Sequence, residues 1–302
     1  MSIAAPSKPA VQHRQSMDLA RFVAAFGVVA AHALASPRDW VGHLSLGLFL
    51  ILTAFLAIQS AERAGGRYPW IARARRLVLP WLFWSAVFRL LDILLSHDPA
   101  RFIPLTNPWS LLIGSTIHLW FLPFVMLAMA LVQPVARLVR SPASLMAGSG
   151  LMLAVGLPLF WLHEFLPMPD PLPQWAFGLP LYVYGLLLAP AHRLNRPLLP
   201  LAAMALLTAA GWAMAGKPWA LTALIAALAF ELFWRLPLRH PLLPALGRVA
   251  FGIYLMHPFF MLVAYKIFGP DAGFWTKTFT AFLLSWAATV IALRLPVIRR
   301  LV

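Results

Sequence analysis

The 302-residue sequence contains no cysteine and only nine acidic residues. Without thiols the chain can form no disulfide, no thiol nucleophile and no cysteine-ligated metal centre. It also lacks a P-loop and the G-x-G-x-x-G, H-E-x-x-H and G-x-S-x-G motifs, so nothing in it favours nucleotide hydrolysis or the usual serine and zinc hydrolase reactions. We therefore expect no metal site and no permanently bound cofactor.

Hydrophobic side chains are what the chain has in excess. They make up 62% of its residues, whereas charged residues make up 11%. A soluble domain cannot be so apolar throughout. A membrane-crossing helix needs about 20 apolar residues, and short loops leave room for about ten such spans. The sequence thus predicts an all-α fold, a polytopic transmembrane helical bundle. We expect its spans at about residues 17–36, 44–61, 77–95, 117–135, 144–163, 173–190, 197–215, 218–235, 249–268 and 274–293.

The basic residues, which give the chain a formal net charge of +15, are unevenly distributed. Most lie in one set of alternating loops and in the two tails, as the positive-inside rule describes for cytoplasmic segments. Both termini are therefore predicted to be cytoplasmic, and the charge does not indicate nucleic-acid binding. We expect residues 1–16 to be a disordered cytoplasmic tail, 17–294 the membrane domain and 295–302 a short basic cytoplasmic tail.

The first span carries ionisable side chains where lipid disfavours them. Arg21 and His32 are separated by about three whole helical turns, so they share one face with about 16 Å between them. Asp18 lies one turn from Arg21 and can pair with it. In the functional interpretation, Arg21 attracts an anionic group and His32 is a general base or a transient acyl carrier. In the alternative, Arg21 reaches the cytoplasmic headgroups and His32 bonds to a neighbouring helix.

The same stretch shares features with a secretory signal peptide, because its apolar run ends in the A-x-A pattern Ala33-Leu34-Ala35. Asp18 and Arg21 are unusual inside the apolar region of a signal peptide. We therefore expect the segment to be retained as the first span.

A cluster of arginines precedes the third predicted span. Arg73, Arg75 and Arg76 lie in a loop that is expected to be cytoplasmic, and Arg73 and Arg76 face one way if the segment is helical. Guanidinium groups pair well with phosphate oxygens, so the three arginines are candidates for binding phosphate groups. Alternatively, they serve only to anchor a cytoplasmic loop.

Two pairs of charged residues lie within later spans. Arg89 and Asp92 are three residues apart in the third span, so Asp92 either pairs with Arg89 or orients an imidazole such as that of His32. Glu231 and Arg235 are one turn apart in the eighth span and are expected to form a salt bridge.

Two further histidines stand beside aromatic residues. His118 and Trp120 open the fourth span, where Trp120 and Phe121 can also be read as aromatics of the membrane interface. Tyr254 and His257 lie three residues apart on one face of the ninth span, near the middle of the membrane.

These segments, in this order, resemble the acyltransferase-3 membrane family. The resemblance rests on the ten residues between Arg21 and His32, on Arg73-x-x-Arg76, on His118-Leu-Trp-Phe-Leu-Pro123 and on Gly252-Ile-Tyr-Leu-Met-His-Pro258. It extends over residues 17–294. The chain departs from the family's second-span pattern at Thr53 and Ala54, where Ser and Gly are common, which argues against close helix packing there.

The resemblance implies an integral-membrane O-acyltransferase of a bacterial inner membrane. Such an enzyme moves an acyl group, commonly acetyl from acetyl-CoA, to a hydroxyl of a saccharide or lipid-linked glycan of the envelope. The three loop arginines and Arg21 would hold the CoA phosphates. His32 would deprotonate the acceptor or carry the acyl group. A donor for the oxyanion would come from Tyr254, His257, Trp120 or His118.

Two other functions fit the same residues. A transporter or lipid-linked sugar flippase would use the polar face of the first span as a permeation path, with His32 as a proton relay. A scaffold that resembles an acyltransferase but lacks activity is the third possibility.

Overall fold

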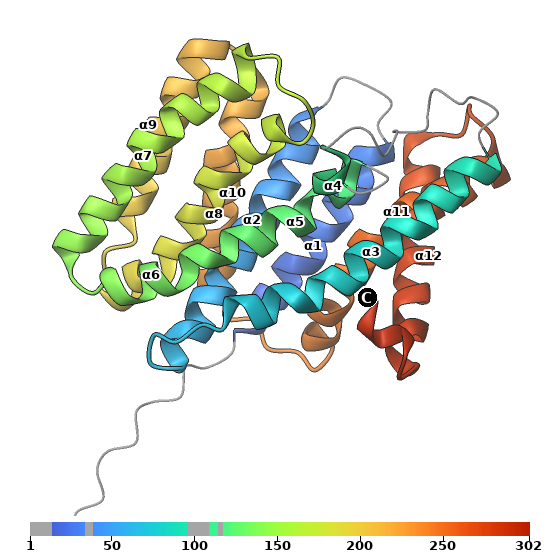
Figure 1. The fold of residues 1–302 in the computed structure, drawn as a ribbon, viewed down its shortest axis with the longest axis horizontal. Helices are drawn as coiled ribbons and strands as arrows, with labels where there is room; N and C mark the ends of the chain where they lie inside the picture. The colour runs from blue at the N-terminus through green and yellow to red at the C-terminus, as the bar shows by residue number, and fades with distance from the viewer. Residues whose placement is uncertain (1–13, 34–38, 96–108, 114–116) are drawn as a thin grey trace, which may run out of the picture.

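A computed structural model describes residues 14–33, 39–95, 109–113 and 117–302 of the protein (Figure 1). Within these ranges the secondary structure is helical and contains no strand. Ten segments are long and apolar enough to cross a membrane, which confirms the predicted all-α bundle of about ten spans. Most of the tail predicted at residues 1–16 lies outside the described residues.

The ten spans follow one another in chain order, and the fourth is assembled from four short helical pieces. They are α1 (Gln15–Ala33), α2 (Asp39–Arg63), α3 (Trp70–Leu95), the composite of η2 (Ile117–Trp120), α5 (Phe121–Ala128), η3 (Met129–Leu131) and α6 (Val132–Leu138), α7 (Pro142–Phe165), α8 (Leu172–Arg193), α9 (Leu198–Ala215), α10 (Pro218–Arg235), α11 (Leu243–Phe268) and α12 (Phe274–Arg294). The short helices α4 (Ser110–Ile113) and η4 (Ile298–Arg300) lie outside the spans.

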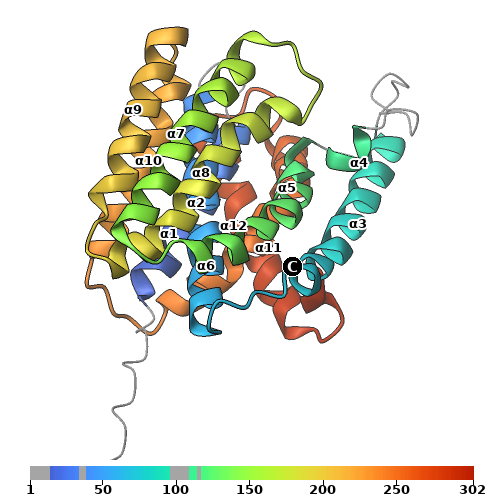
Figure 2. The same cartoon turned by 60° about the vertical axis from the view of Figure 1, so that its left-hand side comes forward.

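Helices α1 and α2 pack against each other in the middle of the molecule (Figures 1 and 2). On one side α8 and α10 pack directly on α2, and α7 and α9 complete that half of the bundle. On the other side α11 packs on α1, and α12 packs on α11. Helix α3 stands at the edge, where its main contact is with α5 (Figure 2). The first span is thus central to the bundle.

Helices α2 and α8 approach closely because Gly185 of α8 has no side chain. A Cβ at that position would lie 2.5 Å from the carbonyl oxygen of Ile51 and 2.8 Å from the Cβ of Ala54. The expectation of looser packing around Thr53 and Ala54 is therefore wrong. The small residue that permits close contact is on the partner helix, where the sequence of α2 could not reveal it.

Three helices begin at least five residues earlier than the hydrophobic pattern predicts. Helix α2 begins at Asp39 rather than near residue 44, α3 at Trp70 rather than near residue 77, and α11 at Leu243 rather than near residue 249. Hydropathy marks only the part of a helix that lies in hydrocarbon, whereas residues such as Arg and Leu continue a helix readily beyond it. Consequently, the arginine cluster lies on the first turns of α3 and not in a loop.

Helix α1 begins and α12 ends at the same end of the bundle, here termed the terminal end; the opposite end is termed the distal end (Figure 1). Helices α2 and α8 finish at the terminal end, and α3 starts there, as alternating spans require. The positive-inside rule predicts that this end faces the cytosol, and that assignment stays a prediction.

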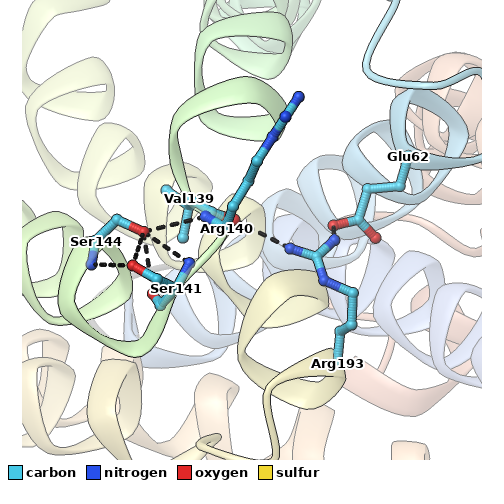
Figure 3. A network of polar contacts seen from close by, with 6 residues as sticks. All are labelled: Glu62, Val139, Arg140, Ser141, Ser144 and Arg193. Atoms are coloured by element: carbon cyan, nitrogen blue, oxygen red, sulfur yellow. Dashed lines mark hydrogen bonds and ion pairs between the residues drawn. The ribbon is translucent and has the colours of Figure 1, made fainter.

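A polar network joins several helices at the terminal end (Figure 3). Arg193 of α8 forms an ion pair with Glu62 of α2 and donates from Nη2 to the Val139 carbonyl at 3.0 Å. Beside it, Ser141 and Ser144 form a capping box at the start of α7, with each backbone N–H donating to the other side chain. The network holds α2, α8 and the α6–α7 turn together beside residues 64–69, which lead into α3.

Candidate active site

Three histidines from distant parts of the chain meet in the distal half of the bundle. His32 lies in the last turn of α1, His118 in η2 and His257 in α11. The ring centroids of His32 and His257 are 4.7 Å apart, and those of His118 and His257 are 5.4 Å apart. His118 and His257 are buried, whereas His32 is exposed. These residues, termed the histidine cluster, therefore combine a buried interior with one accessible imidazole.

Backbone carbonyls fix the tautomers of two members of the cluster. His32 Nδ1 lies 2.8 Å from the Val28 carbonyl oxygen, and His257 Nδ1 lies 2.6 Å from the Tyr254 carbonyl oxygen. A carbonyl oxygen can only accept, so each Nδ1 carries the hydrogen and donates it. The neutral ring then presents a lone pair at Nε2. His32 Nε2 is thus prepared to accept a proton, as a general base requires.

Two imidazole nitrogens in the cluster lack hydrogen-bond partners. Nε2 of His118 and Nε2 of His257 are both buried without one among the described residues. Leaving such an atom unpaired costs about 1–3 kcal/mol, and buried polar groups are rarely left so without a functional reason. The free nitrogens point to a site that a polar ligand completes.

Tyr254 connects the cluster to the rest of the bundle. Its hydroxyl donates to the His118 carbonyl oxygen, and its own carbonyl accepts from His257. The expectation was that Tyr254 or His257 supplies a hydrogen bond to an oxyanion. In this arrangement the phenol proton and the His257 Nδ1 proton are both given to backbone carbonyls, so both groups act first as supports of the cluster.

A cavity of about 260 Å³ lies on the other side of Tyr254, toward the terminal end. Its wall includes Arg21 of α1, Phe49 of α2, Tyr68 of the α2–α3 loop, Arg73 of α3, Phe121 of α5 and Phe251 of α11. Most of the remaining lining is aliphatic. No acidic residue is among the described residues that line it. Two guanidinium groups therefore face a largely apolar space.

One layer of aromatic rings separates this cavity from the histidine cluster. The Tyr254 ring lies 5.9 Å from Phe49, 5.4 Å from Phe121 and 6.4 Å from Phe251, all three of which line the cavity. On its other side the same ring lies 6.1 Å from His257. The cavity and the imidazoles are thus neighbours across a single tyrosine.

The two functional candidates on α1 occupy the two sides of that layer. Arg21 lines the cavity together with Phe251 of α11, and His32 contacts His257 of α11. Both side chains therefore lie on the α11 side of α1, as their spacing predicted. Asp18 is buried and its Oδ1 lies 3.9 Å from Arg21 Nη1, which confirms the predicted pairing.

Only one of the three arginines of α3 reaches the cavity. Arg73 is partly buried in its wall, whereas Arg75 and Arg76 are exposed and do not line it. The three-residue spacing of Arg73 and Arg76 leaves them about 60° apart around the helix, and at this edge helix that rotation is enough to turn Arg76 outward. Sequence alone could not choose among the three.

The two aromatic residues at the start of the fourth span, Trp120 and Phe121, are buried. Trp120 and Phe121 are 5% and 4% exposed and pack inside the bundle, so their interpretation as interfacial aromatics is wrong. Trp120 packs on Phe121 and Phe124, away from the three imidazoles.

Asp92 is partly buried on α3, and its role in orienting an imidazole stays a prediction. Among the described residues, no group of three or more His, Asp or Glu side chains has an arrangement that suits a metal ion.

A buried carboxylate in the terminal half has a partner that sequence reasoning missed. Glu231 lies 3.6 Å from Arg235, which confirms the predicted salt bridge. It also lies 2.9 Å from His192 Nε2 on α8. The contact crosses between α8 and α10, so no local spacing in the sequence could have signalled it.

The model of an acyltransferase domain family matches residues 14–295, which includes all the residues of the histidine cluster and of the cavity. No curated protein and no solved structure matches the chain. The family match confirms the resemblance drawn from the motifs, and together with the ten spans it indicates a multi-pass membrane protein. The chain belongs to the acyltransferase-3 family of membrane acyltransferases.

Proposed function

We propose that the protein transfers a short acyl group, acetyl in the simplest case, from cytosolic acyl-CoA to a hydroxyl of an envelope or exported saccharide. The setting is the inner membrane of a bacterium. The observation that carries the proposal is the position of His32, which contacts His257, while His257 contacts the Tyr254 ring beside a cavity containing Arg21 and Arg73.

The cavity suits the narrow part of an acyl-CoA. At about 260 Å³ it is near the lower end of ligand pockets, which are commonly about 300–1,000 Å³. It therefore suits a pantetheine arm better than a whole nucleotide. The phosphates would stay at the terminal end, where Arg73 and Arg21 can pair with phosphate oxygens and the exposed Arg75 and Arg76 add positive charge.

His32 supplies the acid–base chemistry of this proposal. Its Nε2 removes the proton of the acceptor hydroxyl as the oxygen attacks the thioester carbonyl carbon. When the resulting tetrahedral centre collapses, the carbon–sulfur bond breaks, and the thiolate takes up the proton held on the imidazolium. The products are an ester and free CoA thiol. The variant in which Nε2 itself carries the acyl group for a moment uses the same nitrogen.

For the thioester to reach His32, the aromatic layer must admit it. Tyr254 has Phe49 and Phe121 on its cavity side and His257 on its other side. A modest rotation of these rings would join the cavity to the histidine cluster. A permeation path would need the same opening, because in this conformation the layer interrupts the polar face of α1 between Arg21 and His32.

Transfer of radiolabel tests the proposal. Inverted membrane vesicles containing the protein are given labelled acetyl-CoA, and envelope saccharides are analysed for label and by mass spectrometry. We expect His32→Ala to lower transfer by about 100-fold or more, as for loss of a general base. His240→Ala, which removes an exposed histidine far from the cluster, should have no effect. Full transfer by His32→Ala, or saccharide movement without acylation, would refute the proposal.

A further inference from the structure

Tyr68 is buried although it belongs to a short loop. The loop follows α2, and Gly65 and Gly66 turn the chain with φ values of +67° and +83°, which glycine adopts without strain. The Tyr68 backbone N–H then donates to Gln133 Oε1 of α6 at 3.1 Å. Only 3% of Tyr68 is exposed, and its side chain lines the cavity. The loop is therefore built to place this phenol in the cavity wall.

The guanidinium of Arg73 is held between Tyr68 and α2. Arg73 Cζ lies 4.7 Å from the centroid of the Tyr68 ring, within the range of a cation–π contact. Arg73 Nη2 donates to Ser60 Oγ at 2.8 Å. An arginine has five N–H donors, so Arg73 retains further donors for a ligand beyond the one given to Ser60. The neighbouring Arg75 and Arg76, which leave α3 in other directions, are exposed.

The phenol of Tyr68 remains a hydrogen-bond donor at neutral pH. Burial raises the pKa of Tyr68 above its ordinary value, and the nearby Arg73 guanidinium offsets only part of that rise. The cavity wall therefore contains a neutral hydroxyl and two cations, Arg73 and Arg21. Asp18 pairs with Arg21, and no acidic residue is among the described residues that line the cavity beside Arg73. A partly buried cation without a counter-charge favours an anionic ligand.

We propose that Tyr68 is a positioning residue that holds Arg73 toward the cavity. The cavity then binds preferentially those ligands that carry a compact phosphate anion. The inference rests on the proposed function in naming acyl-CoA as the ligand, and it adds a residue that fixes the guanidinium of the arginine that faces the cavity. Loss of the ring face would release Arg73 to solvent, where fixing it again on binding costs conformational entropy. The effect should fall on donor affinity and not on chemistry at His32.

The experiment uses the full-length protein in lipid nanodiscs. Binding of CoA and of inorganic pyrophosphate is measured by calorimetry, and acetyl transfer is measured from acetyl-CoA and from acetyl-pantetheine, which lacks phosphates. The variants are Tyr68→Leu, Tyr68→Phe, Arg73→Ala and the double variant Tyr68→Leu with Arg73→Ala. The matched control is Tyr265→Leu, because Tyr265 is an exposed tyrosine with Lys277 Nζ 5.8 Å from its ring centroid.

We expect Tyr68→Leu to weaken CoA and pyrophosphate binding by about tenfold, the size of a partly desolvated cation–π contact. It should raise KM for acetyl-CoA at nearly unchanged kcat, and leave acetyl-pantetheine transfer unchanged. Tyr68→Phe, which keeps the ring face, should retain most of the affinity. In the Arg73→Ala background, Tyr68→Leu should cost nothing further, because there is no guanidinium left to hold.

Three results would overturn the inference. The first is equal phosphate affinity in Tyr68→Leu and Tyr265→Leu. The second is an equal loss with acetyl-pantetheine, which would mean that Tyr68 only supports packing. The third is the absence of pyrophosphate and CoA binding in the unmodified protein. Tyr68-dependent pyrophosphate binding without any acetyl transfer would instead uphold the anion site and remove the proposed function.

Discussion

The imidazoles of His32 and His257 lie edge to face, with ring centroids 4.7 Å apart, although they come from the first and ninth spans of the chain. Each ring donates its Nδ1 hydrogen to a carbonyl of its own helix. His32 is the accessible member and His257 is fully buried. The pair thus combines an accessible imidazole with a buried one that supports it.

Replacing the buried support should slow the chemical step. We expect His257→Phe, which keeps an aromatic ring at the site, to lower kcat of acyl transfer by about 10–100-fold, the usual loss for a residue that orients a functional ligand or base. CoA affinity should not change, because the cavity lies beyond Tyr254. Steady-state transfer and CoA calorimetry measure the two effects. An unchanged kcat would show that His257 contributes nothing to the action of His32.

Acyl transfer should depend on pH through His32. A general base must be neutral, so kcat/KM is expected to rise with pH as the imidazolium loses its proton, and then level off. At lower pH the imidazolium has no lone pair at Nε2. Residual transfer by His32→Ala should lack this rise. A profile that is the same with and without His32 would assign the titration to another group.

Donor binding should be insensitive to pH on the alkaline side. Because burial raises the pKa of Tyr68, its phenol stays protonated to a higher pH than an exposed tyrosine does. CoA affinity measured between about pH 7 and 9 should therefore be constant, since the ordinary tyrosine pKa is about 10. A fall in affinity across that interval that Tyr68→Phe abolishes would show that the phenol ionises there.

Removing the Tyr254 hydroxyl should affect stability more than donor binding. In Tyr254→Phe the ring layer between cavity and cluster is kept, but the His118 carbonyl loses the hydrogen bond that it accepts. We expect the free energy of unfolding to fall by about 1–3 kcal/mol, the cost of an unsatisfied buried polar group. Thermal unfolding in detergent measures the loss. A large drop in CoA affinity would contradict this division of roles.

The Glu231–His192 contact should act as a structural link. Glu231 is 5% exposed and accepts from His192 at 2.9 Å. Glu231→Ala should destabilise the protein by about 1–3 kcal/mol, with acyl transfer per folded molecule unchanged because the pair joins α8 to α10 away from the cluster. Glu164→Ala is the matched control variant, because the Glu164 carboxylate also accepts a hydrogen bond from a ring nitrogen, that of Trp219, at 2.8 Å. Loss of transfer at full stability would give Glu231 a catalytic part.

The amino-acid sequence by itself determined the ten spans and the local pairs. A span is recognised from about 20 consecutive apolar residues, and the Asp18–Arg21 and Glu231–Arg235 pairs follow from positions one helical turn apart. The order of the motifs along the chain also identified the family. All of these are properties of short stretches, which is why they can be read without knowing how the helices pack.

Only the tertiary structure decided which candidates meet. Packing of α1 against α11 brings His32 to His257, and packing of α3 at the edge of the bundle turns Arg73 inward while Arg76 stays exposed. The loop that contains the buried Tyr68 donates a backbone hydrogen bond to Gln133, a residue of the fourth span. The rotation and neighbours of each helix are set by the sum of many contacts between distant segments, and no single stretch of sequence contains that information.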